Sequence, residues 1–286
     1  MIRLAWTTDP HLNHAPTAEW ERWLGEISRG SPHGLVITGD ISESDDVCFQ
    51  LRRLGEAFHG PIYFVLGNHD FYERSIATTR REVIDLCREI PSLHYLTDAG
   101  PVELVRGSYL VGEDGWGDAT WGDYERSPVR LNDFRLIDDF RQADPADWKG
   151  LLLRFGREAA GRLRAKLEAV PEHAADVLVA THVPPFRESC WYEGRTTDEL
   201  WSPFFVCGAI GNLLSEFVSL RPGCRFRVLC GHTHHPGIAQ IASNLIVHTG
   251  AAAYGKPALE GVLVVSGGGS RLLSVSPDTG NSPETG

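Results

Sequence analysis

The chain lacks long apolar runs, paired cysteines and a basic charge balance, and each absence excludes a class of protein. No stretch approaches the roughly 20 apolar residues of a membrane span, so we expect no membrane partner. The six cysteines are scattered and form no Cys-x-x-Cys pair. This pattern argues against a small disulfide framework, and we expect the thiols to be mostly reduced and buried.

Basic residues are outnumbered: 27 Lys and Arg stand against 38 Asp and Glu, a formal charge of −11. Proteins that bind nucleic acid by neutralising its phosphates need a basic surface, so the balance argues against nucleic acid as a partner. A small anionic substrate is still allowed if bound cations supply positive charge locally. The N-terminus, Met1–Trp6, leaves no room for a secretory signal before the first motif, which favours a cytoplasmic location.

Short apolar runs alternate with longer helical patterns, which is typical of strands joined by crossover helices. At 286 residues the chain is expected to form a single α/β domain over 1–275. Strands are predicted at 2–6, 35–38, 62–66, 102–105, 109–111, 177–180, 226–230, 245–248, 261–265 and 271–275, and helices at 17–28, 45–58, 75–90 and 151–170. The segment 112–149 has few strand signals and is predicted to be an elaboration over the edge of the site. The polar segment 276–286 is predicted to be a disordered tail.

Five motifs each follow an apolar run that is predicted to be a strand. They are Asp9-Pro10-His11, Gly39-Asp40, Gly67-Asn68-His69-Asp70, Thr181-His182 and Gly231-His232-Thr233-His234. Because open α/β sheets bind ligands at the carboxyl ends of their strands, we expect these five ends to converge. Imidazole and carboxylate together suit Mn, Fe or Zn.

The local spacing of the motifs also bears on metal binding. In extended chain, alternate residues share a face, so Asp9 and His11 are expected to point the same way, as are His232 and His234. The glycines at 39, 67 and 231 would leave space where a Cβ would crowd the ligands.

In this order, the five motifs resemble those of the calcineurin-like metallophosphoesterase superfamily. The resemblance spans residues 9 to 234 and implies an α/β sandwich of two mixed β-sheets flanked by helices. It also implies two divalent or trivalent transition-metal ions. The first would be bound by Asp9, His11 and His234, the second by Asn68, His182 and His232, with Asp40 bridging both. His69 would be the general acid, and Asp70 would orient its imidazole.

The reaction implied by the resemblance is hydrolysis of a small phosphate mono- or diester, such as a nucleotide or cyclic nucleotide. The nucleophile would be a hydroxide held between the two metals. After Asp40 the chain reads Ile41-Ser42-Glu43, where many relatives carry a further Asp or an Asp-Arg-Gly run. The missing Arg argues against a protein Ser/Thr phosphatase. Two alternatives stay open: a nuclease, and a metal-binding scaffold without activity.

Four further residues are candidates for substrate contacts: His14, Trp116, Arg187 and His235. The two histidines adjoin the metal motifs, but both could equally be solvated loop residues. Trp116, with Trp121 and Tyr124 nearby, could stack on a nucleobase or could simply pack the elaboration onto the sheet. Arg187 could bind a phosphate or remain on the surface.

Overall fold

Two six-stranded sheets form the centre of the computed structural model, which describes residues 1–274. The first sheet has the order β14 (Gly269–Ser274), β13 (Gly261–Ser266), β1 (Ile2–Thr7), β2 (Gly34–Thr38), β3 (Ile62–Val65) and β4 (Leu93–Tyr95). The second has the order β11 (Gly237–Ala242), β12 (Leu245–Thr249), β10 (Arg225–Cys230), β7 (Asp176–Thr181), β6 (Ser108–Glu113) and β5 (Val102–Val105). Both are mixed. In the first sheet β1 to β4 run parallel, and β13 and β14 join one edge by antiparallel pairing. In the second sheet the four inner strands run parallel, and the edge strands β11 and β5 pair antiparallel with them. The predicted fold class is confirmed.

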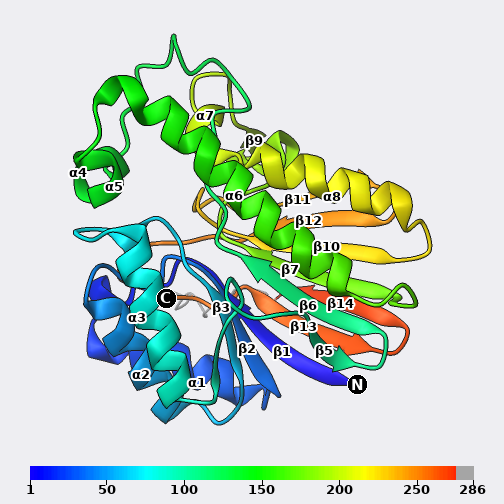
Figure 1. Cartoon of the computed structure of the whole chain (residues 1–286). Coiled ribbons are helices and arrows are strands. Elements are labelled where there is room, and N and C mark those ends of the chain that lie inside the picture. Colours follow the sequence, from blue (N-terminus) through cyan, green and yellow to red (C-terminus); the bar gives the residue numbers. More distant parts are fainter. Residues whose placement is uncertain (275–286) are drawn as a thin grey trace, which may run out of the picture.

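Helices cover the outer faces of both sheets (Figure 1). The first sheet carries α1 (Thr17–Arg29), α2 (Asp46–Ala57) and α3 (Ile76–Glu89), and the second carries α6 (Trp148–Ala169) and α8 (Gly208–Leu220). Shorter helices are α4 (Asp133–Leu136), α5 (Asp138–Arg141) and α7 (Ser202–Phe205), with 3₁₀ turns at Leu12–His14, His69–Phe71, Pro145–Asp147 and Arg187–Ser189. None of the helices in residues 1–274 is long and apolar enough to span a bilayer.

Alternating side chains divide the core into three layers. In β2, Leu35 and Ile37 pack under the helices of the first sheet, whereas Val36 joins the cluster between the two sheets. In β7, Val177 packs under α6 and α8, and Leu178 points into the central cluster. Because both faces of these strands are buried, their sequences are continuous apolar runs rather than alternating ones.

All ten predicted strands and all four predicted helices are present, with ends displaced by at most three residues. The last residue of the predicted strand 271–275 and the predicted tail 276–286 lie outside the described residues. Four strands were not predicted: β4, β11, and the short pair β8 (Trp191–Tyr192) and β9 (Arg195–Thr196). Helix α8 was also missed, although Ile210, Leu214 and Phe217 have helical spacing; its two glycines weakened that signal.

Candidate active site

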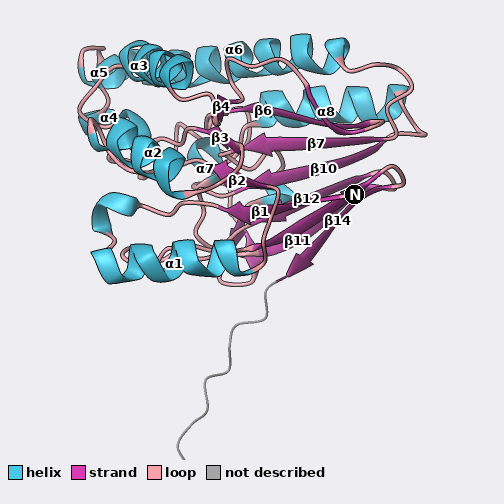
Figure 2. Cartoon of the chain, turned by 90° about the horizontal axis from the view of Figure 1, so that it is seen from below, coloured by secondary structure: helices cyan, strands magenta, loops and turns pink. Residues whose placement is uncertain are grey.

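The parallel strands of both sheets end on the same side of the molecule, and Figure 2 shows the arrowheads of β1, β7 and β10 pointing the same way. Asp9, Asp40 and Asn68 follow β1, β2 and β3 of the first sheet. His182 and His232 follow β7 and β10 of the second. The expected convergence of strand ends is therefore present, and the site lies across the junction of the two sheets.

The backbone at this junction is not extended, contrary to the expectation for the Asp-x-His and His-x-His triplets. Asp9, His11, Asp40, His232 and His234 all have positive φ, between 41° and 69°. Hydrogen bonds hold two of these residues in place: Asp9 N–H donates to Gly39 O and His11 N–H to Asp40 O, both at 3.0 Å. Such conformations cost about 1–3 kcal/mol each and persist only where the surrounding structure imposes them. The side chains converge because the chain turns sharply, not because alternate residues share a face.

Two glycines leave the room that the carboxylates occupy, as the sequence predicts. A Cβ on Gly67 would overlap the carboxylate of Asp40, and a Cβ on Gly231 would overlap that of Asp9. Any other residue at either position would push a carboxylate out of the site.

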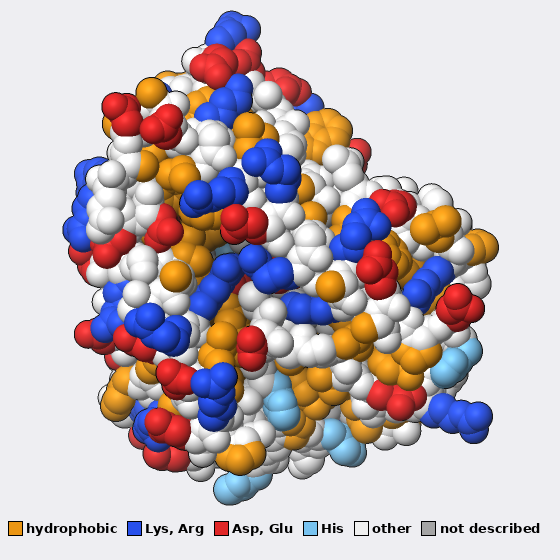
Figure 3. All heavy atoms as spheres, viewed as in Figure 1, with side chains coloured by type: hydrophobic (Ala, Val, Ile, Leu, Met, Phe, Trp, Pro, Cys, Tyr) orange, Lys and Arg blue, Asp and Glu red, His pale blue; other side chains and the backbone are white. Residues whose placement is uncertain are grey.

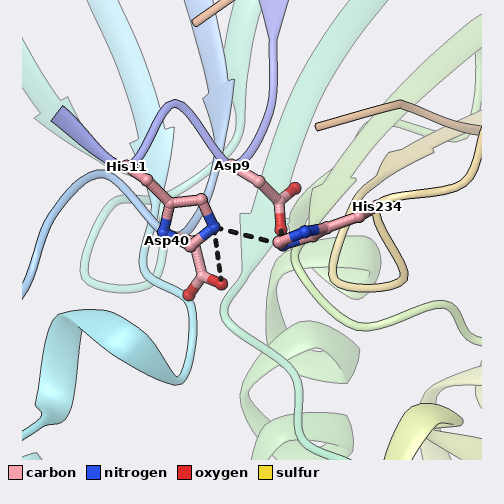
Figure 4. Close-up of side chains that lie close together, drawn as sticks. All are labelled: Asp9, His11, Asp40 and His234. Atoms are coloured by element: carbon pink, nitrogen blue, oxygen red, sulfur yellow. Dashed lines mark hydrogen bonds and ion pairs between the residues drawn. The ribbon is translucent and has the colours of Figure 1, made fainter. Parts of the chain in front are cut away.

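Four side chains form the first cluster: Asp9, His11, Asp40 and His234, whose potential ligand atoms lie within 4.8 Å of one another. They point toward a common centre in Figure 4. The Nε2 atoms of His11 and His234 are 3.1 Å apart. His11 Nε2 lies 3.8 Å from Asp40 Oδ2, and His234 Nε2 lies 3.5 Å from Asp9 Oδ1. Two imidazoles and two carboxylates thus surround one point, as in a transition-metal site.

A second cluster forms around Nε2 of His182. This atom lies 3.1 Å from Asn68 Oδ1, 3.2 Å from His232 Nδ1 and 3.5 Å from Asp40 Oδ1. Asp40 therefore presents Oδ2 to the first cluster and Oδ1 to the second. The seven residues that the motifs nominated as ligands form two adjacent clusters with Asp40 between them.

In each imidazole of the pair His182 and His232, one nitrogen faces the other ring and the second, outer nitrogen faces away from it. The hydrogen bond of each outer nitrogen shows whether the ring can bind a metal through its inner nitrogen. His182 Nδ1 faces Thr38 O at 2.9 Å, and His232 Nε2 faces Phe204 O at 3.1 Å. Since a carbonyl only accepts, each of these nitrogens carries the proton of its neutral ring. The two inner nitrogens then both present lone pairs at 3.2 Å. A cation between them would turn this repulsion into ligation, so the donor set fits a metal.

Burial and charge favour the ligating protonation states of Asp40, His11 and His232. Burial alone would raise the pKa of Asp40, but His182, His69 and His11 outweigh it and hold the pKa of that carboxyl well below its usual range. Burial lowers the pKa of His11 to about 4, although Asp40 and Asp9 oppose this. Burial and the neighbouring His182 lower the pKa of His232 to about 3. Near neutral pH, Asp40 is thus a carboxylate, and both imidazoles are uncharged and able to bind a cation.

His69 lies beside the clusters, and its imidazole is oriented by Glu43 rather than by Asp70. Its Nδ1 lies 3.1 Å from Glu43 Oε1, and its backbone N–H donates to Asp40 Oδ1 at 2.9 Å. Burial lowers the pKa of His69, but Asp40 and Glu43 raise it more, so the pKa lies above its ordinary value. We expected Asp70 to orient the imidazole of His69, but the hydrogen-bond partner of that ring is Glu43.

The fully buried carboxylate of Asp70 binds backbone instead. It accepts from Ser42 N–H at 2.9 Å and from Gly67 N–H at 2.7 Å. These bonds connect the loop after Asp40 to the loop that carries Asn68 and His69. Asp70 therefore fixes the relative position of two motifs without touching the imidazole.

Sequence reasoning missed three neighbours of the site. The first is Glu43, and the sequence offered a signal for it, because it is an acidic residue three positions after Asp40. Asp133 accepts from Asn68 Nδ2 at 2.9 Å, which turns Asn68 Oδ1 toward His182, but no sequence signal connects residues 65 positions apart. Tyr254 lies with its ring 4.4 Å from that of His11, and it follows β12 in a loop without a motif.

A cleft of about 840 Å³ opens above the clusters, and its lining includes Asp40, Asn68, His69, His232 and His234. Its other walls come from residues of the segments 131–133 and 190–205, together with Tyr72 and Tyr254. The segment 112–149 thus contributes Leu131, Asn132 and Asp133.

The four candidate substrate contacts have different environments. His235 lines the cleft, and half-exposed His14 lies near it, 3.6 Å from Glu43. Trp116 is 5% exposed and packs against Phe71 and Phe140, so it belongs to the core and offers no stacking surface. Arg187 is paired with Glu199 and is absent from the lining of the cleft. For Trp116 and Arg187 the structure therefore favours the second alternative, a packing role for Trp116 and a surface ion pair for Arg187.

Comparison with known proteins gives a consistent result. A family model described as calcineurin-like phosphoesterase matches residues 2–236. Among curated proteins, none matches the sequence.

Solved structures share the fold at low sequence identity. A phosphopantetheinyl hydrolase from Mycobacterium tuberculosis superposes with a TM-score of 0.65 at 16% identity, over 98% of each chain. A dimetal phosphatase from Danio rerio gives a TM-score of 0.58 at 14% identity, over 96% of this chain and 99% of the other. A putative 5′-nucleotidase from Staphylococcus aureus gives 0.52 at 15% identity, over 98% of this chain but 55% of the other.

Proposed function

The chain belongs to the calcineurin-like phosphoesterase family, and we propose that it hydrolyses a small phosphate mono- or diester at a dinuclear site on the strand ends. One observation carries the proposal: Asp40 presents one carboxylate oxygen to each of two adjacent ligand clusters. Membership of the family makes the protein a phosphoester hydrolase. The identity of the ester and that of the metals, for which we propose Mn, Fe or Zn, are part of the proposal.

We assign the first metal to Asp9, His11 and His234, the second to Asn68, His182 and His232, and the bridge to Asp40. When bound, two such cations lower the pKa of water and neutralise charge on phosphoryl oxygens. Asp133 supports the second site because it holds the carboxamide of Asn68 with its oxygen toward His182. Thr38 and Phe204 carbonyls hold His182 and His232 in the ligating tautomer.

His69 is the proposed proton donor to the departing oxygen. Its imidazole lines the cleft, and Glu43 holds Nδ1, which leaves Nε2 as the nitrogen able to face a substrate. The raised pKa favours the imidazolium near neutral pH, which is the form that a general acid needs. Proton donation of this kind contributes about 10²–10⁴ in rate.

The charge distribution supports a small substrate over a nucleic acid. The cleft lining contains Asp133, Glu193 and Asp198 but a single Lys or Arg among the described residues, Arg195. On the face that Figure 3 shows, acidic and basic side chains are interspersed. A nuclease would require a basic track for the phosphate backbone.

Metal analysis with an activity assay tests the proposal. The purified protein should contain close to two transition-metal ions per chain and should hydrolyse bis-aryl or mono-aryl phosphate esters with added Mn²⁺. The ratio of the two rates indicates diesterase or monoesterase preference. Trace metal together with no cleavage of either ester would favour the non-enzymatic scaffold.

A further inference from the structure

A hairpin beside the metal clusters has no part in the proposed reaction. Its strands β8 and β9 are joined by Glu193 and Gly194, whose φ values of 47° and 75° are both positive, as a two-residue type I′ turn requires. Both strands line the cleft. The turn therefore holds Trp191, Tyr192 and Arg195 at the wall of the cleft by local geometry.

Aromatic side chains around the cleft are unusually exposed. Tyr192, Trp201 and Tyr254 are 60%, 47% and 52% exposed, and all three line the cleft. Tyr254 adjoins the first cluster, with its ring 5.3 Å from that of His234, and the ring of Tyr192 lies 4.7 Å from that of His235, the cleft residue that follows His234. Open aromatic faces beside a reaction centre suit a flat, apolar-faced group, because stacking buries surface that is otherwise left in water.

Arg195 adds a positive charge on the same hairpin. It is the one Lys or Arg that lines the cleft in residues 1–274, and it makes no ion pair there. Arg187, a few residues earlier, differs because Glu199 already neutralises it. A guanidinium without a partner, facing a cleft that also holds carboxylates, is suited to bind an anion brought in by a ligand.

Resting on the proposed phosphoesterase function, we propose that the hairpin recognises a leaving group that combines a flat aromatic ring with a second anionic group. Nucleotides with two phosphoryl groups have both features. One phosphoryl group would lie at the metals, the other near Arg195, and the base against Tyr192 or Trp201. The cleft volume of about 840 Å³ lies in the range of roughly 300–1,000 Å³ that organic ligands occupy.

Competitive inhibition tests this assignment without requiring the probe to be cleaved. The inhibition constants of AMP, ADP and inorganic pyrophosphate are measured against Mn²⁺-dependent hydrolysis of an aryl phosphate ester, with free Mn²⁺ held constant. ADP should bind about tenfold more tightly than AMP or pyrophosphate. Tyr192→Ala should weaken AMP and ADP about tenfold and leave pyrophosphate unchanged. Arg195→Gln should weaken ADP and pyrophosphate about tenfold and leave AMP within about twofold.

Two controls separate recognition from folding. Arg187→Gln, which removes an arginine that is already paired, should change none of the three constants. Arg195→Lys should restore part of the ADP affinity. Two results would overturn the hairpin assignment while the aryl ester is still hydrolysed: ADP binds no more tightly than pyrophosphate, or Tyr192→Ala and Arg195→Gln both bind ADP as tightly as the wild type. In either case the phosphoesterase function stands.

Loss of the function itself gives a different result. If no ester is hydrolysed, calorimetric binding of ADP to the Mn²⁺-loaded protein and the same variants measures the hairpin contribution directly. Equal ADP affinity in wild type and in both variants would then reject the hairpin assignment as well.

Discussion

The imidazoles of His182 and His232 face each other through Nε2 and Nδ1 at 3.2 Å, while the outer nitrogen of each ring faces a backbone carbonyl. Without a cation, a proton must lie between the inner nitrogens. The pKa directions agree: burial lowers the pKa of both rings, but Asp40 and Asp9 raise that of His182 above its ordinary value, whereas His182 lowers that of His232 further. Two ligands are thus held in a geometry that a metal stabilises.

Metal removal is therefore expected to destabilise the fold. A ligand that binds only the native state at 100 times its Kd contributes about 3 kcal/mol. Dialysis against a chelator should lower Tm by several degrees, and adding Mn²⁺ back should restore it. The chelator added to the Asp40→Ala variant is the control and should shift Tm little. An unchanged Tm in the chelated wild type would contradict the assignment of a resident metal.

Asp40→Ala should remove both metals, because Asp40 is the only residue with an atom in each of the two clusters that we assign. Metal content should fall from about two ions to well below one per chain, and turnover should fall by more than about 10³. Asp9→Ala, which removes a proposed ligand of the first metal only, is the matched comparison and should retain part of the second metal, although it also removes the acceptor of the His232 backbone N–H. Equal losses in the two variants would argue against the bridging role. Elemental analysis of the purified variants measures this.

His69→Ala should keep the metals and lose about 10²–10⁴ in kcat, since the imidazole is assigned to proton donation rather than to ligation. Glu43→Gln should have a smaller effect with a distinct pH signature. The active form is the imidazolium, so kcat falls as pH rises through the pKa of His69. Since Glu43 raises that pKa, its removal should move the alkaline limb of the profile to lower pH. A His69→Ala variant with wild-type kcat would exclude the general-acid role.

Gly67→Ala should damage the site although glycine has no chemistry of its own. The added Cβ would overlap the carboxylate of Asp40 and must displace it, so metal affinity should fall at least about tenfold. Gly25→Ala is the control: in helix α1 its Cβ meets nothing within 4 Å. That substitution should stabilise the protein by about 0.5–1 kcal/mol and leave metal content unchanged. Normal metal binding by Gly67→Ala would show that the loop can relax.

His248 predicts a pH dependence of stability away from the metals. Burial and the nearby Arg227, whose guanidinium bonds its Nε2, lower the pKa of His248 from 6.5 to about 4. A depressed histidine pKa gives stability that is present above pH 6.5 and is lost as pH falls through about 4, because only the unfolded state binds the proton readily. The loss amounts to about 3 kcal/mol, since each pKa unit corresponds to about 1.4 kcal/mol.

His248→Gln should flatten the curve of unfolding free energy between pH 4 and 6.5, as measured by urea denaturation with the metals chelated in both proteins. His11 and His232, whose pKa values are also lowered, contribute in the same window, so the difference between wild type and variant is the relevant quantity. His173→Gln, at an exposed position, is the control and should leave the curve unchanged. Parallel curves for wild type and His248→Gln would contradict the prediction.

Much of the fold and of the site could be predicted because both depend on local pattern. The runs before Asp9, Asp40 and His182 are apolar on both faces, which identifies inner strands, and strand ends in such sheets meet at one edge. The residue types at those ends limit the chemistry to metal binding. These conclusions need no knowledge of which distant segments touch.

Tertiary structure alone decided the rest. The partner of His69 is Glu43 rather than its chain neighbour Asp70, because the turn at Asn68 directs the Asp70 carboxylate onto backbone amides. Asp133 meets Asn68 across 65 residues, and the cleft wall comes from the hairpin at 191–196 instead of Trp116. The sequence by itself determined which residues lie at strand ends. Long-range packing decided which of these residues are in contact and through which atoms. It sets the orientation of each side chain, and the local periodicity of the sequence carries no information about that orientation.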